Sequence, residues 1–386
     1  MDQNAFSFAL TDEQETIRQT VRSFAEKDMR PTVMKHDESQ DFPFEVVRQL
    51  SALGFMGITV PENLDGAGLT DIEATLIIEE LARVDPSVAL TVASHNSLCI
   101  GHIMLYGSEE QKRRYVPDLA TGRALGAWGL TEPGSGSDSG GMKTVARKDG
   151  VDWLLTGSKS FITQGSVGST YVIMAVTDTE KPRESITAFI LEKGMPGFTI
   201  GKKENKLGMR CSDTATLLFD GVRVPKENVV GGIGDGFKQA LKVLDGGRIG
   251  IAALSVGIAQ GALDASLAYA KERKQFGKAI GEFQAVQWKL ADMATEVSAA
   301  RVLTRLAAQR KVEGKPFGLQ ASQAKYYASE IASRAASEAV QIHGGYGFIK
   351  EFPVEKLYRD VKLMTIGEGT SEVQKMVIAR YLMNKA

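Results

Sequence analysis

The sequence predicts a multidomain α+β protein, with an N-terminal α-helical domain, a central β domain and a C-terminal four-helix bundle. A chain of 386 residues is long for one hydrophobic core, so two or three domains are expected. The pattern of apolar residues changes twice, from helical spacing to short β-branched runs and back to helical spacing. These changes predict domains at residues 1–123, 124–236 and 237–386.

The first region has the character of helices. Thr11 and Gln14 stand at capping-box spacing, and Ile17 and Val21 then recur on one helical face. Charged helix-forming runs continue to residue 115, with prolines and glycines between them. The beginning of the chain lacks the apolar segment of a signal peptide, so we expect no secretory leader there.

The second region predicts strands, because short β-branched and aromatic runs alternate with turn residues. The clearest runs are 171–176, 186–191 and 215–219. A glycine-rich segment at 231–236 ends the region. Its spacing fails the dinucleotide-binding fingerprint, so we interpret it as a hinge between domains.

The third region is rich in Ala, Glu, Lys, Arg and Gln and returns to helical periodicity. Leu290, Met293 and Val297 illustrate this spacing. Four long helices packed as a bundle are expected. Their predicted ranges are 237–273, 282–311, 317–343 and 353–384.

Composition excludes several classes of function. With 46 basic and 47 acidic residues, the formal charge of −1 offers no broad attraction to nucleic acid or to an anionic membrane. The most apolar helical run, Ile249–Ala259, is too short and too glycine-interrupted to span a bilayer. The two cysteines form no disulfide framework, and the four scattered histidines predict no metal site. A reducing compartment is expected, either the cytoplasm or an organellar matrix.

A carboxylate between two glycines near the C-terminus is the candidate reacting group. Gly367 and Gly369 lack a Cβ, so the backbone beside Glu368 can adopt unusual φ and ψ values and approach a ligand closely. The alternative is a solvated glutamate at a helix start, with Thr370 or Ser371 as the cap. This segment alone leaves both interpretations open.

Two other glycine-rich segments could approach a cofactor. Leu130–Asp138 combines flexible backbone amides with several hydroxyls, which suits a polar or anionic cofactor edge. A solvated surface turn is its alternative. Gln341–Gly347 follows a predicted helix, where its glycines could pass close to a phosphate or serve only as a C-cap.

Five motifs follow one another along the chain: LTEPGSGSD from Leu130, GSKSFITQG from Gly157, ERKQFG from Glu272, QIHGGYG from Gln341 and EGTSEVQ from Glu368. Taken in this order, they resemble the acyl-CoA dehydrogenase family, and the resemblance covers essentially the whole chain. Residues 244–252 are most similar to the short-chain, butyryl-CoA-like branch. The resemblance implies a flavoprotein oxidoreductase of fatty acid β-oxidation with the fold described above, assembled as a homotetramer.

The resemblance implies FAD as the cofactor, held between the β domain, the bundle and a neighbouring subunit. Thr163 matches the hydroxyl near flavin N5, and Arg273 and Gln284 match residues of the adjoining subunit that meet the adenine dinucleotide. The cofactor-binding residues implied by the motifs are Trp128, Leu130, Thr131, Gly136, Ser137, Phe161, Ile162, Thr163, Arg273, Phe276, Gln284, Gln341, Ile342, Gly344, Gly345, Thr370 and Glu372.

The resemblance also implies the reaction. Glu368 matches the catalytic base that removes the α-proton of an acyl-CoA, while the β-hydride passes to flavin N5 and a trans-2-enoyl-CoA is formed. Some branches carry this glutamate at the position of Gly247 instead. An electron-transferring flavoprotein is the implied electron acceptor. The implied substrate-binding residues are Ser137, Asp245, Arg248, Gly367 and Gly369.

The acyl group is expected to be short, and Gly367 qualifies that expectation. Tyrosine is common at this position in the family, so glycine frees volume near the α and β carbons for a branched or cyclic group. No arginine occurs between Ser87 and Gly101, which disfavours a dicarboxylic substrate. His95 could add polarity to the acyl pocket or be satisfied by backbone. A flavin-dependent oxidase and a non-catalytic helical scaffold are the alternative classes.

Overall fold

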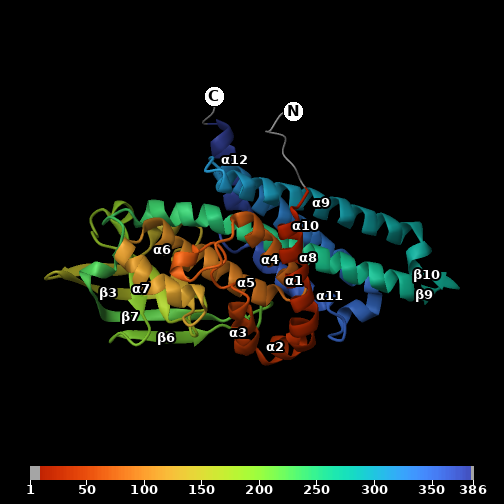
Figure 1. Cartoon of the computed structure of the whole chain (residues 1–386), viewed down its shortest axis with the longest axis horizontal. Helices are drawn as coiled ribbons and strands as arrows, with labels where there is room; N and C mark the ends of the chain where they lie inside the picture. The colour runs from red at the N-terminus through yellow and green to blue at the C-terminus, as the bar shows by residue number, and fades with distance from the viewer. Residues whose placement is uncertain (1–8, 384–386) are drawn as a thin grey trace.

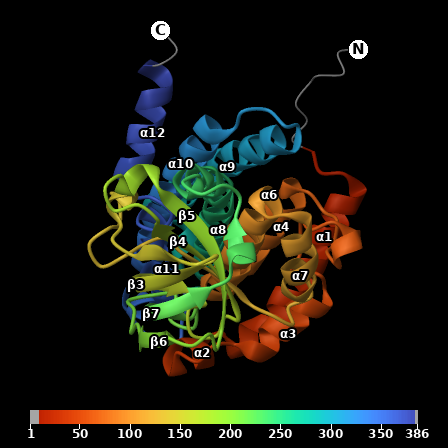
Figure 2. The same ribbon diagram turned by 90° about the vertical axis from the view of Figure 1, so that its left-hand side faces the viewer.

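The computed structural model describes residues 9–383 and confirms the predicted fold class of N-terminal helices, central sheet and C-terminal helices. The sheet occupies one end of an elongated molecule. The helices α8 (Gly236–Glu272), α9 (Gln284–Val312) and α10 (Gly318–His343) run along its length (Figure 1). Viewed onto the sheet end, the helices α1 (Asp12–Phe24), α3 (Phe44–Ala52) and α7 (Glu109–Ala120) lie to the right of the strands β3 (Asp152–Thr163), β6 (Phe198–Lys203) and β7 (Thr214–Val224) (Figure 2). The outer ends of the predicted first and third domains, and residue 384 of the predicted last helix, lie outside the described residues.

The first helix begins at the predicted capping box. The Thr11 hydroxyl accepts a hydrogen bond from the Gln14 backbone N–H at 3.2 Å, and the Gln14 side chain accepts one from the Thr11 N–H. Two backbone donors at the helix start are thereby satisfied. The N-terminal helices are α1 Asp12–Phe24, α2 Val33–Ser39, α3 Phe44–Ala52, α4 Asp71–Ala82, α5 Pro86–Ser94, α6 Gly101–Tyr106 and α7 Glu109–Ala120.

The central sheet includes all three runs predicted as strands. Its strand order is β6-β7-β3-β2-β4-β5-β8, and β1 pairs with β4 in parallel. Alternate residues of β4 face opposite sides: Val172 and Met174 pack with the N-terminal helices, whereas Tyr171 and Ile173 join the core of the sheet domain. The strands are β1 Gly126–Gly129, β2 Val145–Asp149, β3 Asp152–Thr163, β4 Thr170–Val176, β5 Ile186–Glu192, β6 Phe198–Lys203, β7 Thr214–Val224 and β8 Val229–Val230.

Three of the four predicted C-terminal helices are present, and the fourth prediction is wrong. The range 353–384 is not one helix, because Glu368 and Gly369 adopt left-handed φ values of 52° and 92° that no α-helix can contain. The helical elements are α8 Gly236–Glu272, α9 Gln284–Val312, α10 Gly318–His343, α11 Val354–Asp360, the 3-10 helix η10 Val361–Thr365 and α12 Ser371–Met383; a hairpin of β9 Lys274–Gln275 and β10 Lys278–Ala279 joins α8 to α9.

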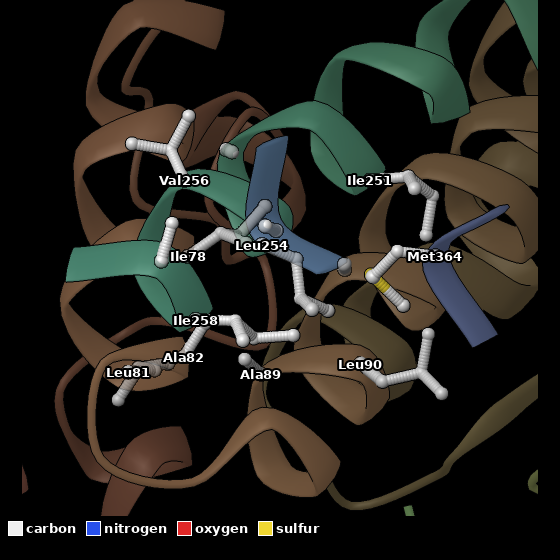
Figure 3. Close-up of a cluster of buried hydrophobic side chains, with 14 of the residues drawn as sticks. Ile78, Leu81, Ala82, Ala89, Leu90, Ile251, Leu254, Val256, Ile258 and Met364 are labelled. Atoms are coloured by element: carbon white, nitrogen blue, oxygen red, sulfur yellow. The ribbon is translucent and has the colours of Figure 1, made fainter. Parts of the chain in front are cut away.

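The N-terminal helices and the bundle share one hydrophobic core. Ile78 of α4 and Leu90 of α5 belong to the same buried cluster as Leu254 of α8 (Figure 3). Met364 of η10 joins this cluster and is fully buried. The core therefore reaches to within four residues of Glu368.

Within residues 9–383, two helical stretches are long and apolar enough to cross a membrane, Pro86–Tyr106 and Gly236–Glu272. In each stretch, however, 72% of the apolar window is buried inside the protein. The run Ile249–Ala259 was expected to be too short to span a bilayer, but the helix that contains it has 37 residues. Length therefore does not distinguish a membrane span from a core helix here. The burial of both stretches is typical of core helices.

A buried ion-pair cluster joins the three regions of the chain. Lys356 of α11 donates to Asp85, the N-cap of α5, at 2.9 Å and to Asp360 at 2.5 Å. Asp360 also accepts a hydrogen bond from the backbone N–H of Met209, in the segment before β7. Burial disfavours the charged form of Lys356, but the carboxylates of Asp360 and Asp85 outweigh burial and raise its pKa above the usual value. The cluster thus stabilises the packing of all three regions.

We predict that Lys356→Met destabilises the protein strongly, because it leaves two carboxylates buried beside each other without their cation. Breaking such a pair costs about 3–5 kcal/mol. The measurement is the thermal unfolding midpoint, with Arg48→Met as the control at the exposed Arg48–Glu45 pair. The control should stay within about 0.5 kcal/mol of the unmodified protein. Equal, small shifts in both variants would contradict this role for the cluster.

Candidate active site

Glu368 lies in the turn between η10 and α12, where the predicted fourth helix is broken. Its carboxylate Oε2 is buried and has no hydrogen-bond partner within residues 9–383. Leaving a buried carboxylate oxygen unpaired is costly, so such an atom marks a site built for a ligand or a proton. The alternative of a solvated side chain does not fit this burial. The cap proposed with it is nevertheless present, since Thr370 Oγ1 accepts from the Val373 N–H at 3.3 Å.

The environment of Glu368 suits a base that works near neutral pH. Burial raises the pKa of Glu368 to about 7, although the positive charges of Lys325 and Arg248 act to lower it. A carboxylate with an ordinary pKa would be a weaker proton acceptor. The buried position therefore turns a common surface residue into a competent acid/base group.

Gly247 of α8 faces this carboxylate. A Cβ placed at Gly247 would lie 2.0 Å from Glu368 Oε2 and 3.2 Å from Leu98 Cδ2. The family resemblance implied Gly247 as the position at which some branches carry their glutamate. The Glu368 carboxylate reaches this position, and glycine at 247 leaves room for it.

Asp245 and Arg248 lie on the same stretch of α8 and pair with each other. Arg248 Nη1 donates to Asp245 Oδ1 at 2.6 Å and to Ser322 Oγ at 3.3 Å. Burial raises the pKa of Asp245 and lowers that of Arg248. Arg248 Nε is buried without a partner among the described residues. That unsatisfied donor is available to a ligand.

Gly367 is open on its side-chain face. A Cβ there would make only ordinary contacts, at 3.5–3.6 Å to atoms of Leu363. Its φ is not left-handed, so a larger residue could adopt the same backbone conformation. Gly369 differs, because its φ is 92° and a Cβ would lie 2.7 Å from Gln374 Nε2. Glycine is therefore required at 369 but optional at 367.

Two predicted cofactor segments meet in the β domain. The backbone N–H of Ser160 donates to Thr131 O at 2.9 Å, and Lys159 Nζ donates to Leu130 O at 3.1 Å. Lys159 also pairs with Glu132 at 2.7 Å and is completely buried. The loop after β1 is thus tied to the end of β3, next to Phe161.

Phe161 is exposed where a strand residue of its size is normally packed. It adopts a left-handed φ of 58°, and 66% of its surface is exposed. The β3–β7 register shifts between Lys159 and Ile162, a bulge that re-aims the side chain. Ile162 is buried and Thr163 half-buried. An aromatic ring held outward on a strained backbone is typical of a ligand-binding surface.

Trp128 is positioned by a buried histidine. Its Nε1–H donates to His102 Nδ1 at 3.0 Å, and His102 Nε2 lies 3.0 Å from Gln239 Oε1. Burial lowers the pKa of His102 to about 4, so the ring is neutral at physiological pH. Because Nδ1 accepts, Nε2 carries the hydrogen. His95, in contrast, contacts only backbone, at Leu119 O and the Gly126 N–H, as one of its two sequence interpretations stated.

Most of the remaining predicted cofactor residues form a second group around the β9–β10 hairpin and the end of α10, whereas Thr370 and Glu372 lie at the start of α12. Four members of the second group line an open pocket of about 470 Å³: Arg273, Ile342, Gly344 and Gly345. A Cβ at either glycine would meet no atom within 4 Å, so the backbone is accessible. Phe276, at 94% exposure, projects from the hairpin. Gln284 and Gln341 are exposed nearby in the chain, at the first residue of α9 and near the end of α10.

Within one chain the two groups do not come together. Figure 1 places β3 and the β9–β10 hairpin at opposite ends of the molecule. The first group offers an aromatic surface and the open, exposed loop glycine Gly136 beside the exposed hydroxyl of Ser137. The second offers a cation and bare backbone, which suit phosphates. Each group by itself fits one part of a dinucleotide such as FAD.

Sequence reasoning missed the buried lysines of the site. Lys159 lies on β3 between two predicted cofactor segments, and Lys325 lies on α10 beneath Gly369. The burial of Lys325 could have been predicted from its helical spacing with Ala321, Ala324 and Ala328, which are all fully buried. A lysine at the spacing of an apolar stripe is a candidate buried charge.

Comparison with known proteins gives a consistent result. Family models of the acyl-CoA dehydrogenase N-terminal, middle and C-terminal domains match residues 11–123, 127–222 and 234–383. A Clostridium acetobutylicum protein named short-chain-specific acyl-CoA dehydrogenase is 47% identical, covering 96% of this chain and 98% of its own. Subunit CarC of the Acetobacterium woodii caffeyl-CoA reductase–Etf complex is 44% identical, covering 97% and 99%.

Solved structures agree with the sequence relatives. Butyryl-CoA dehydrogenase from Megasphaera elsdenii superposes with a TM-score of 0.96 at 45% identity, covering 98% of this chain and all of that one. Acyl-CoA dehydrogenases are FAD-dependent, so the predicted cofactor is confirmed at the level of the family, as is the enzyme class. The three matched domains, and the extent of the identity, show that this chain belongs to the acyl-CoA dehydrogenase family.

Proposed function

We propose that this enzyme catalyses FAD-dependent α,β-dehydrogenation of a short-chain acyl-CoA to the trans-2-enoyl-CoA, with Glu368 as the base. The observation that carries the proposal is Glu368 Oε2, which faces Gly247 and is buried with no hydrogen-bond partner among residues 9–383. The similarity to proteins named for short-chain acyl-CoA and butyryl-CoA supports the substrate class.

The chemistry requires a base and a stabilised carbonyl oxygen. The α-hydrogen of a thioester is weakly acidic, so its removal needs a carboxylate held close by and an amide donor to the oxygen as negative charge develops. Glu368 supplies the carboxylate, and we assign its own backbone N–H as the donor. FAD, when bound, supplies the acceptor for the hydride that leaves the β carbon. Burial of the carboxylate excludes water that would otherwise compete for the proton.

We propose that the flavin ring and its neighbouring chain are held by Trp128, Phe161, Thr163 and the loop around Ser137. A neighbouring subunit of a homotetramer would hold the dinucleotide end with its second group of cofactor residues: Arg273, Phe276, Gln284, Gln341, Ile342, Gly344 and Gly345. Thr370 and Glu372, at the start of α12, would complete the cofactor site. The separation of the two groups within one chain supports this shared arrangement.

An electron-transferring flavoprotein is the electron acceptor that we propose. The Acetobacterium relative is named as a subunit of a complex with such a protein. We place the enzyme in the cytoplasm. Cys99 and Cys211 are buried free thiols, which fits a reducing compartment.

Glu368→Gln should abolish reduction of the bound flavin, because an amide cannot accept the α-proton. The rate of anaerobic bleaching by butyryl-CoA is expected to fall by about a thousandfold or more. FAD should remain bound, which the visible spectrum reports. Glu351→Gln, at an exposed glutamate of the same region, is the control and should bleach normally. Rapid bleaching in the Glu368 variant would reject the base assignment.

The bleaching rate should rise with pH through about 7. Glu368 must be ionised to act as a base, and its pKa is raised to about 7, so the protonated, inactive form dominates below that pH. Stopped-flow traces at several pH values, all with saturating substrate, measure the profile. A profile already flat between about pH 5 and 8 would show that Glu368 has an ordinary pKa.

We infer that the open face of Gly367 admits a branched or cyclic acyl group. Gly367→Tyr should reduce bleaching by isobutyryl-CoA at least about tenfold while leaving butyryl-CoA within a few-fold, because the ring fills the added space. Gly367→Ala is the matched control and should change neither rate much, given the ordinary contacts expected of its Cβ. If the unmodified enzyme accepts only straight chains, the inference about Gly367 is wrong.

A further inference from the structure

Lys325 is a buried cation that lacks the ion pair expected of it. It is fully buried on α10, and its Nζ donates to the backbone oxygen of Gly369 at 2.7 Å. Two other fully buried lysines, Lys159 and Lys356, each pair with a carboxylate. Within residues 9–383, no carboxylate oxygen forms such a salt bridge with Lys325. Burying an unpaired ammonium costs stability, so its position needs another explanation.

The turn that Lys325 contacts is the turn that presents Glu368. Glu368 and Gly369 both have left-handed φ values, a conformation that costs free energy at a non-glycine residue. Gln374 Nε2 donates to Glu368 O at 3.2 Å and to Gly369 O at 3.0 Å. The Gly369 carbonyl thus receives one charged donor and one neutral donor. Together they hold the turn from α10 on one side and α12 on the other.

The charges around Glu368 come from three helices. Asp245 and Arg248 of α8 pair with each other, and Glu330 of α10 accepts from the Ser371 hydroxyl at 2.5 Å. Glu372 of α12 is exposed to solvent. Within residues 9–383, Glu368 Oε2 is buried with no hydrogen-bond partner, and Lys325 Nζ donates to a backbone carbonyl without forming a salt bridge. Burial lowers the pKa of Lys325 to about 8, while Glu368 acts to raise it.

We propose that Lys325 is a positioning residue for the base: through the Gly369 carbonyl it holds the left-handed turn, and its charge favours the ionised carboxylate of Glu368. The proposal rests on the function assigned above to Glu368. It accounts for a lysine on an otherwise apolar helical stripe. The proposal also assigns different roles to the two donors to Gly369 O. Both Lys325 and Gln374 can hold the turn, but only Lys325 carries a charge that acts on Glu368.

Three variants of the FAD-bound enzyme test the proposal, with anaerobic bleaching by butyryl-CoA followed across pH. Lys325→Met should move the midpoint of the pH profile upward by about one unit, because a stabilising positive charge is lost. Lys325→Arg keeps the positive charge, so the midpoint of its pH profile should equal that of the unmodified enzyme. Gln374→Leu is the matched control: it loses a neutral donor to the same carbonyl, so its rate should fall at every pH without a shift of the midpoint.

A second readout does not depend on turnover. The infrared band of protonated Glu368, identified by its loss in Glu368→Gln, reports ionisation of the carboxylate directly. Its pH midpoint should rise in Lys325→Met, and in Lys325→Gln if the methionine variant does not fold. An unchanged midpoint in a folded neutral variant, or an equal shift in Gln374→Leu, would overturn the proposal. If no acyl-CoA bleaches the unmodified enzyme, the proposed function fails, whereas the infrared titration still decides the role of Lys325.

Discussion

The packing of this protein depends on burying a lysine between two aspartates at the place where its three regions meet. Lys356 pairs with Asp85 from the N-terminal helices and with Asp360 of its own helix, and Asp360 also holds the Met209 backbone of the β domain. Ion pairs buried this deeply tolerate little displacement, because each charge needs the others to offset its lost hydration. Since α11 leads directly into η10 and then the Glu368 turn, the same cluster fixes where the candidate base lies.

Buried charge is used in two ways in this fold. Lys356 and Lys159 are satisfied by carboxylates, and each ties one segment to another. Around Glu368 the pattern changes, because Glu368 Oε2 and the Nε of Arg248 are buried without hydrogen-bond partners in the part of the chain that the structure describes. Unsatisfied polar groups cost stability that the satisfied clusters elsewhere offset. The contrast distinguishes the candidate active site from the structural core more clearly than burial alone.

Glycine residues, which lack a side chain, determine the shape of the candidate active site. Glycine at 247 leaves room for the Glu368 carboxylate, and glycine at 369 permits a turn that a Cβ would strain. The separation of the two groups of cofactor residues has a different origin. The length of α8 carries the β9–β10 hairpin far from the sheet, so the two groups lie at opposite ends of the chain (Figure 1).

The sequence by itself determined the fold class, the capping box at Thr11, the three clearest strands and three of four long helices, because these depend on local periodicity and capping. Its motifs also determined the family. The break in the last predicted helix was missed, since helical spacing persists on both sides of Gly367 and only the left-handed backbone ends it. The buried state of Lys325 and the missing partner of Glu368 Oε2 were decided by tertiary structure alone. Whether a charged side chain meets water, a counter-ion or neither depends on residues distant in the chain, and no local pattern contains that information.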